Sequence, residues 1–141
     1  MVDRDLILRK LANLEEYEAQ VSEFRGVTVA AYQADWKTQR IVERTLQMAV
    51  EACADVANHV IADRHLRVPS TYAEAFEILG EAGVLRQELA QAMVRVARFR
   101  NILVHDYARI DPDILVGILG QRLGDFARFR ESIVEWLDQS S

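Results

Sequence analysis

The chain has 141 residues, enough for one domain whose hydrophobic core needs no metal or disulfide. Its composition, 50% hydrophobic and 28% charged, is that of an ordinary soluble globular protein, and no apolar run is long enough to cross a bilayer. The formal charge of −5 argues against broad, non-specific binding of nucleic acid, which normally rests on a basic face, so any RNA contact must be local.

The first predicted helix runs from Asp3 to about Phe24, because apolar residues recur along it in steps of three and four. Gly26 is expected to stop this helix, since glycine is a common residue just after a helix end. A short helical turn is then expected over residues 28–34.

The longest predicted element follows Asp35, its expected N-cap, and runs from about Trp36 to His65. At 1.5 Å per residue it would span about 45 Å. Two neighbouring apolar stripes run along it: Ile41, Thr45, Met48, Ala52 and Val56 form one, and Val42, Leu46, Ala49, Cys53, Ala57 and Val60 form the other. One packing partner does not need so wide a band, so this helix is central in a bundle or also meets another subunit.

A polar group interrupts these stripes, because Asp55, Asn58 and His59 stand at helical spacings that let them touch. Asp55 and His59 are either half of a metal site or a hydrogen-bonded pair within the helix. The sequence offers no companion ligands and no second short-spaced pair, so we predict the hydrogen-bonded pair and no metal.

The single cysteine, Cys53, cannot form an internal disulfide. It lies among alanines and valines with helical spacing, so we expect a buried thiol in a reducing compartment. The N-terminal segment lacks the apolar core of a signal peptide. These features together predict a cytoplasmic protein with no membrane association.

The segment over residues 67–70 is the clearest predicted loop, because Pro69 cannot continue the long helix. Thr71 and Glu74 have the spacing of a capping box and are expected to open a short helix. Gly83 is expected to end it.

Two more helices are predicted in the second half of the chain. One runs from about Leu85 to Arg100, and the other from Pro112, capped by Asp111, to about Leu137. Glycines interrupt the last helix and are expected to mark a close helix approach or a local bend; they are Gly117, Gly120 and Gly124. No strand-like alternation persists, so the fold class is all-α, a bundle of four main helices plus one or two short ones.

Chemically useful side chains are densest between Arg98 and Tyr107. Arg100 and His105 are five residues apart, and a continuous helix would point them about 140° away from each other. A shared site therefore needs the helix to end or bend between them. The apolar pattern fades after Val104, so we predict that Arg100 lies in a last helical turn and that residues 105–107 lie beyond it.

Residues 95–109 form a positive cluster. They contain four arginines, Arg95, Arg98, Arg100 and Arg109, and a single acidic residue, Asp106. The alternative interpretation is that these arginines are surface helix residues paired with acids elsewhere.

The string Arg100-Asn101-x-x-x-His105-x-Tyr107 resembles the signature of HEPN domains, in the version carried by HepT-like toxins of HepT/MntA toxin–antitoxin systems. Residues 57–63 and 72–79 resemble the same family, so the similarity covers most of the chain. The resemblance implies one HEPN domain over residues 1–141, built as a helical bundle.

RNA is cut without a metal when its own 2′-hydroxyl attacks the neighbouring phosphorus. The reaction needs a base, an acid and positive charge on the phosphoryl oxygens. Histidine suits the proton transfers and arginine suits the oxygens, which makes His105 and Arg100 the candidate catalytic residues. One chain has only one motif histidine, and a two-fold homodimer would supply the second. The alternative is that both residues cap helix carbonyls while Tyr107 packs at the end of the bundle.

The resemblance implies the remaining assignments. HEPN ribonucleases pair their motifs at a dimer interface without metal or cofactor, and Asn101 would orient the motif or contact the phosphate. A partner nucleotidyltransferase, MntA, would transfer AMP from ATP to Tyr107 and block the site, as in type VII toxin–antitoxin systems. The competing hypothesis is a non-catalytic helical module that binds a nucleotidyltransferase or a nucleotide.

Overall fold

The computed structural model describes residues 3–140, except for the side chain of Tyr107. It has seven α-helices and one short 3-10 helix: α1 (Arg4–Ser22), α2 (Val29–Ala34), α3 (Trp36–Asp63), α4 (Tyr72–Glu81), α5 (Gln87–His105), η1 (Tyr107–Arg109), α6 (Pro112–Gln121) and α7 (Gly124–Ser140). Residues 3–140 contain no strand, so the all-α prediction is confirmed. None of the helices in this range is long and apolar enough to span a membrane.

Helix starts follow the local cap chemistry. The side chains of Asp35 and Asp111 accept hydrogen bonds from backbone N–H groups two residues on, both at 2.9 Å. Thr71 Oγ1 accepts from the backbone N–H of Glu74 at 3.0 Å. The Glu74 carboxylate accepts hydrogen bonds from Arg67 and Ser70. The structure therefore contains the Thr71 half of the predicted capping box.

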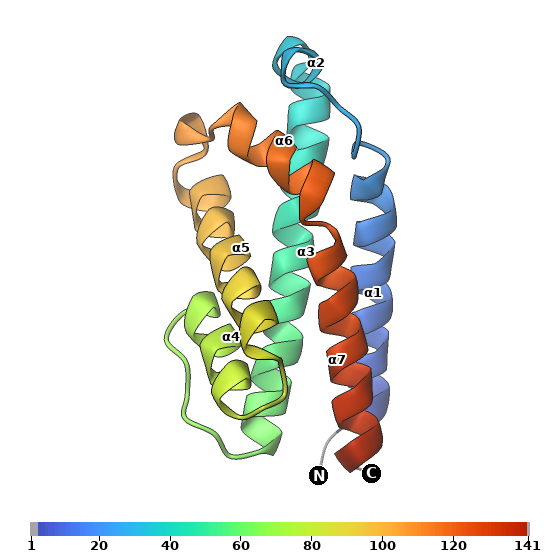
Figure 1. Cartoon of the computed structure of the whole chain (residues 1–141), viewed down its shortest axis with the longest axis vertical. Helices are drawn as coiled ribbons and strands as arrows, with labels where there is room; N and C mark the ends of the chain where they lie inside the picture. Colours follow the sequence, from blue (N-terminus) through green and yellow to red (C-terminus); the bar gives the residue numbers. More distant parts are fainter. Residues whose placement is uncertain (1–2, 141) are drawn as a thin grey trace.

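Helix α3 is the centre of the bundle and packs against α1, α2, α4, α5 and α7. Figure 1 shows it running through the middle of the molecule, with α4 and α5 on one side and α1 and α7 on the other. Its second predicted stripe is buried along its whole length, and Cys53 in that stripe is fully buried, as expected. The first stripe leaves the core at its N-terminal end, where Ile41 is 51% exposed.

Two contacts hold α4 in place. The rings of Phe76 on α4 and Phe129 on α7 meet edge to face with centroids 5.8 Å apart. Gly80 lets α4 approach α5 so closely that a Cβ added to it would lie 2.7 Å from the Cβ of Ala90. The helix ends at Glu81, and Gly83 follows with a φ of 77°, a conformation that glycine adopts readily.

The last predicted helix is two helices in the structure. The chain breaks between α6 and α7 at Arg122 and Leu123, and the Leu123 side chain turns into the core. Gly124 follows this break, in agreement with the expected bend. A Cβ added to Gly117 or Gly120 would meet nothing within 4 Å, so the expectation of a close helix approach is wrong for these two glycines.

Candidate active site at the C-terminal end of helix α5

Helix α5 continues without a break through Arg100 to His105 and is capped by Asp106. The prediction that the helix ends between Arg100 and His105 is therefore wrong, because His105 belongs to the last turn of α5 and only residues 106–107 lie beyond it. Leu103 is 7% exposed and keeps packing on the core, which holds the helix to the bundle for one more turn. The chain leaves the helix only where Asp106 takes φ −151° and ψ 48°.

Arg100 is fixed by two neighbours from other helices. Glu51 of α3 accepts hydrogen bonds from its Nε at 3.0 Å and its Nη2 at 2.5 Å. The guanidinium also lies over the ring of Tyr72, with its central carbon 4.7 Å from the ring centroid. The Arg100 side chain is only 15% exposed, so its orientation is set before any ligand arrives.

Glu51 was not recognised from the sequence, because it lies 49 residues before Arg100 and no motif joins the two. Tyr72 opens one of the segments that resemble the HEPN family, yet its contact with Arg100 was not foreseen either. The Arg100 pairing also changes the predicted positive cluster: Arg100 is neutralised by Glu51, and Arg109 is 3.4 Å from Asp106.

A pocket of about 310 Å³ opens beside Arg100, between α3, α5 and the loop before α4. Asn101 lines it and accepts a hydrogen bond from Arg100 Nη1 at 3.3 Å. Asn58 of α3 lines the same pocket. Asp55 and His59, with which the sequence grouped Asn58, do not line this pocket.

His59 Nε2 and Asp55 Oδ1 lie 3.6 Å apart along one face of α3, so the two side chains are neighbours as predicted but too far apart for the predicted hydrogen bond. Asp55 accepts a hydrogen bond from Lys10 Nζ of α1 at 2.5 Å. Within residues 3–140, no group of three histidine, cysteine or acidic side chains is placed to bind a metal ion. Asp55 is therefore a link between α3 and α1.

His105 is exposed on the last turn of α5. Helical periodicity places it on the same face as Ile102 and Arg98, three and seven residues earlier, and about 140° around the helix from Arg100. One chain therefore does not bring Arg100 and His105 to a single point. Tyr107 begins the 3-10 helix two residues later, and its side chain, the predicted AMP acceptor, lies outside what the structure describes.

Comparison with known proteins gives a consistent result. The family model described as ribonuclease HepT-like matches residues 9–133. The mRNA nuclease HepT of Shewanella oneidensis is 30% identical over 129 residues, which cover 92% of this chain and 96% of that protein. The tRNA nuclease HepT of Aphanizomenon flos-aquae is 31% identical over 108 residues, 77% of this chain and 74% of that protein.

A solved structure is similar over nearly the whole fold. It is a tri-AMPylated Shewanella oneidensis HEPN toxin in complex with an MNT antitoxin, with a TM-score of 0.85 and 28% sequence identity. The match covers 96% of this chain and 99% of the solved one.

Proposed function

Because the chain belongs to the ribonuclease HepT-like family, we propose that it is the toxin of a type VII HepT/MntA toxin–antitoxin pair and cuts RNA as a metal-independent endonuclease. The nuclease names of two relatives support the activity. The observation that carries the proposal is the end of α5, where a fixed arginine and an exposed histidine stand on consecutive turns.

In this reaction a base removes the proton of the RNA 2′-hydroxyl, whose oxygen forms a bond to phosphorus. The bond from phosphorus to the 5′-oxygen breaks, and an acid gives that oxygen a proton. His105 performs the proton transfers, since an imidazole nitrogen can accept a proton and give it back. Arg100 stabilises the phosphoryl oxygens. Asn101 accepts a hydrogen bond from Arg100 Nη1 and so holds that side of the guanidinium beside the pocket.

The same geometry supports a homodimer. Arg100 and His105 point in different directions on one continuous helix, and the chemistry uses two proton carriers. A two-fold axis beside α5 supplies a second histidine and a second arginine to one cleft. Light scattering of the purified protein should give the mass of a dimer at micromolar concentration, and a stable monomer would contradict the composite site.

The proposed control is the addition of AMP to Tyr107 by an MntA-like minimal nucleotidyltransferase. The phenol oxygen attacks the α-phosphorus of ATP, the phenol proton is lost and pyrophosphate leaves. The AMPylated toxin and its MNT antitoxin in the related structure support this step. Tyr107→Phe should retain RNA cleavage, escape the partner and gain no adenylate mass in mass spectrometry, whereas modification at another residue would overturn the regulatory step.

The competing candidate is a non-catalytic module that binds a nucleotidyltransferase or a nucleotide. The Glu51 contact favours it, since a carboxylate already occupies two donors of Arg100. An RNA cleavage assay decides between the two, because only the nuclease cuts RNA.

The assay compares the wild type with His105→Ala, Arg100→Ala and His59→Ala, each with and without EDTA. Removal of His105 or Arg100 should lower the rate about 10²-fold or more. His59→Ala is the control, because His59 is also a histidine near a helix end and its side chain is 40% exposed. EDTA should change nothing, so activity that is lost on chelation and restored by a divalent ion would overturn the mechanism.

A further inference from the structure

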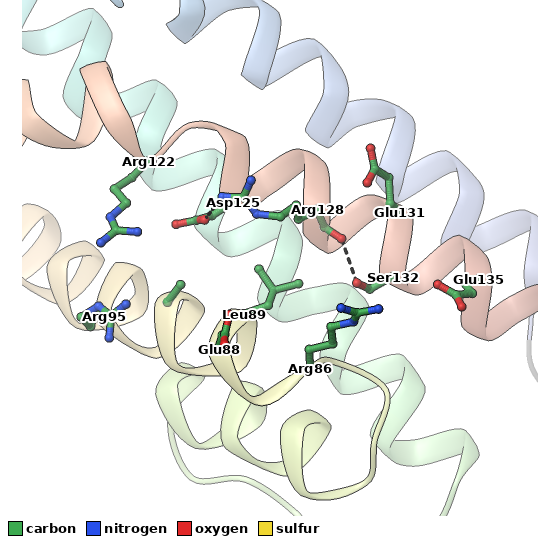
Figure 2. A pocket seen from close by; sticks show the side chains of 11 residues that line it. Arg86, Glu88, Leu89, Arg95, Arg122, Asp125, Arg128, Glu131, Ser132 and Glu135 are labelled. Atoms are coloured by element: carbon green, nitrogen blue, oxygen red, sulfur yellow. Dashed lines mark hydrogen bonds and ion pairs between the residues drawn. The ribbon is translucent and has the colours of Figure 1, made fainter.

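A second concave region lies between α5 and α7, away from the pocket beside Arg100. It encloses about 540 Å³, and four arginines line it: Arg86, Arg95, Arg122 and Arg128. Figure 2 shows Arg122 and Arg86 extending into the space between the two helices, with Arg95 on α5 and Arg128 on α7. We propose that this groove binds the phosphate backbone of the RNA substrate at a distance from the cleavage site. The choice of RNA as ligand rests on the proposed function.

Three of these arginines are available to a ligand. Arg86, Arg95 and Arg122 are exposed, and they make no hydrogen bond or ion pair within residues 3–140. Arg128 differs, because its Nη2 donates to Asp125 Oδ1 at 2.5 Å. An exposed guanidinium without an acidic partner binds phosphate strongly, through two parallel hydrogen bonds.

The acidic side chains of the groove leave one end positive. Asp125 is only 4% exposed, and Arg128 matches its charge. In Figure 2, Arg95 and Arg122 lie toward one end of the groove and Glu135 lies toward the other. Glu131 lies beside Glu135 on α7, away from Arg95 and Arg122, and Glu88 flanks the middle.

The positive end of the groove is the end nearer to His105. Helix α5 runs from Gln87 to His105, so Arg95 stands about 15 Å before the histidine along the helix axis. Arg98 lies between them, is exposed and shares the face of His105. Arg98 also makes no ion pair among the described side chains. A strand held at Arg95 and Arg122 can therefore continue past Arg98 to the catalytic histidine.

The lining also indicates how RNA is held. No aromatic residue lines the groove, and its apolar part consists of Leu89 and Ala92. Bases therefore have no ring on which to stack, and the contacts go to the backbone. Binding at the groove should be independent of base sequence and weaken steeply with salt.

The test measures binding of a labelled single-stranded RNA to protein carrying His105→Ala, so that RNA stays intact. Arg95→Gln, Arg122→Gln and the double variant are compared with Arg9→Gln, which removes the same charge from an exposed, unpaired position on α1. Each groove variant should raise the Kd for RNA about 5- to 10-fold. In a plot of log affinity against log salt concentration, each lost phosphate contact makes the slope about 0.7 less steep, so the double variant should make it about 1.4 less steep. Arg9→Gln should change neither quantity.

With His105 intact, the groove variants should raise KM for RNA cleavage and leave kcat unchanged. Groove variants that bind RNA as tightly as Arg9→Gln would overturn the groove, while cleavage that depends on His105 would still support the nuclease. If the wild type cuts no RNA but the variants still lose RNA affinity, the nuclease fails and the groove stands. If the groove variants bind RNA normally but no longer bind the nucleotidyltransferase, the groove binds an acidic surface of that protein, and the proposal is overturned.

Discussion

Replacing Gly80 with alanine tests the close contact between α4 and α5. The new Cβ would lie 2.7 Å from the Cβ of Ala90, whereas carbon atoms in contact prefer about 3.5–4.0 Å. Ala90 is 2% exposed and has no rotatable side chain with which to move aside, so the helices must separate. Such overpacking costs about 1–3 kcal/mol. Alanine returns up to about 1 kcal/mol of helix propensity, so the net loss of unfolding free energy is about 1 kcal/mol, within a range of about 0–2.

Urea denaturation followed by circular dichroism measures this change, and Gly117→Ala is the matched control. Gly117 is also a helical glycine, but its added Cβ meets nothing within 4 Å, so that variant should gain up to about 1 kcal/mol. Combining Gly80→Ala with Ala90→Gly removes the clash, and the two changes should show favourable coupling of about 1 kcal/mol or more. Stabilisation of Gly80→Ala equal to that of Gly117→Ala would refute the packing argument.

Three further predictions concern the core. The Tyr32 hydroxyl donates to Glu43 at 2.8 Å; burial, and then Glu43, raise the pKa of Tyr32 above its usual value. A raised folded-state pKa gives stability that is present below about pH 10 and lost as the pH rises further, so Tyr32→Phe should flatten alkaline unfolding curves at a cost of about 1–2 kcal/mol at neutral pH. Phe129→Ala leaves a cavity beside Phe76, because the Phe129 ring is fully buried, and should lower the free energy of unfolding by about 3–5 kcal/mol in denaturant titrations. Burial raises the pKa of the Cys53 thiol, so a thiol reagent should label it only as fast as the protein unfolds; rapid labelling of the native protein would contradict the buried position.

Features that depend on neighbouring residues were predictable from the sequence. Asp35, Thr71 and Asp111 cap helices in the structure because the hydrogen bonds of a cap join residues two or three apart. The fold class followed from helical periodicity over long segments.

Features that depend on distant contacts were not predictable. The end of α5 at His105 is set by packing of Leu103 on the core, which the fading apolar pattern did not reveal. The Glu51 partner of Arg100 requires α3 and α5 to be placed side by side, and no local signal encodes that placement. The same holds for the groove, since Arg95 and Arg122 line one space only when the end of α6 and the start of α7 lie beside α5.

Because α5 is unbroken, the number of residues in the spacer between Arg100 and His105 sets the angle between their side chains around the helix axis. One residue inserted into the spacer would turn the imidazole by about 100° and advance it by about 1.5 Å. Four inserted residues would return it to within about 40° of its present direction, one turn further along. The tolerance of the spacer should therefore follow the helical repeat, so that an insertion of one or two residues disturbs the chemistry more than an insertion of four.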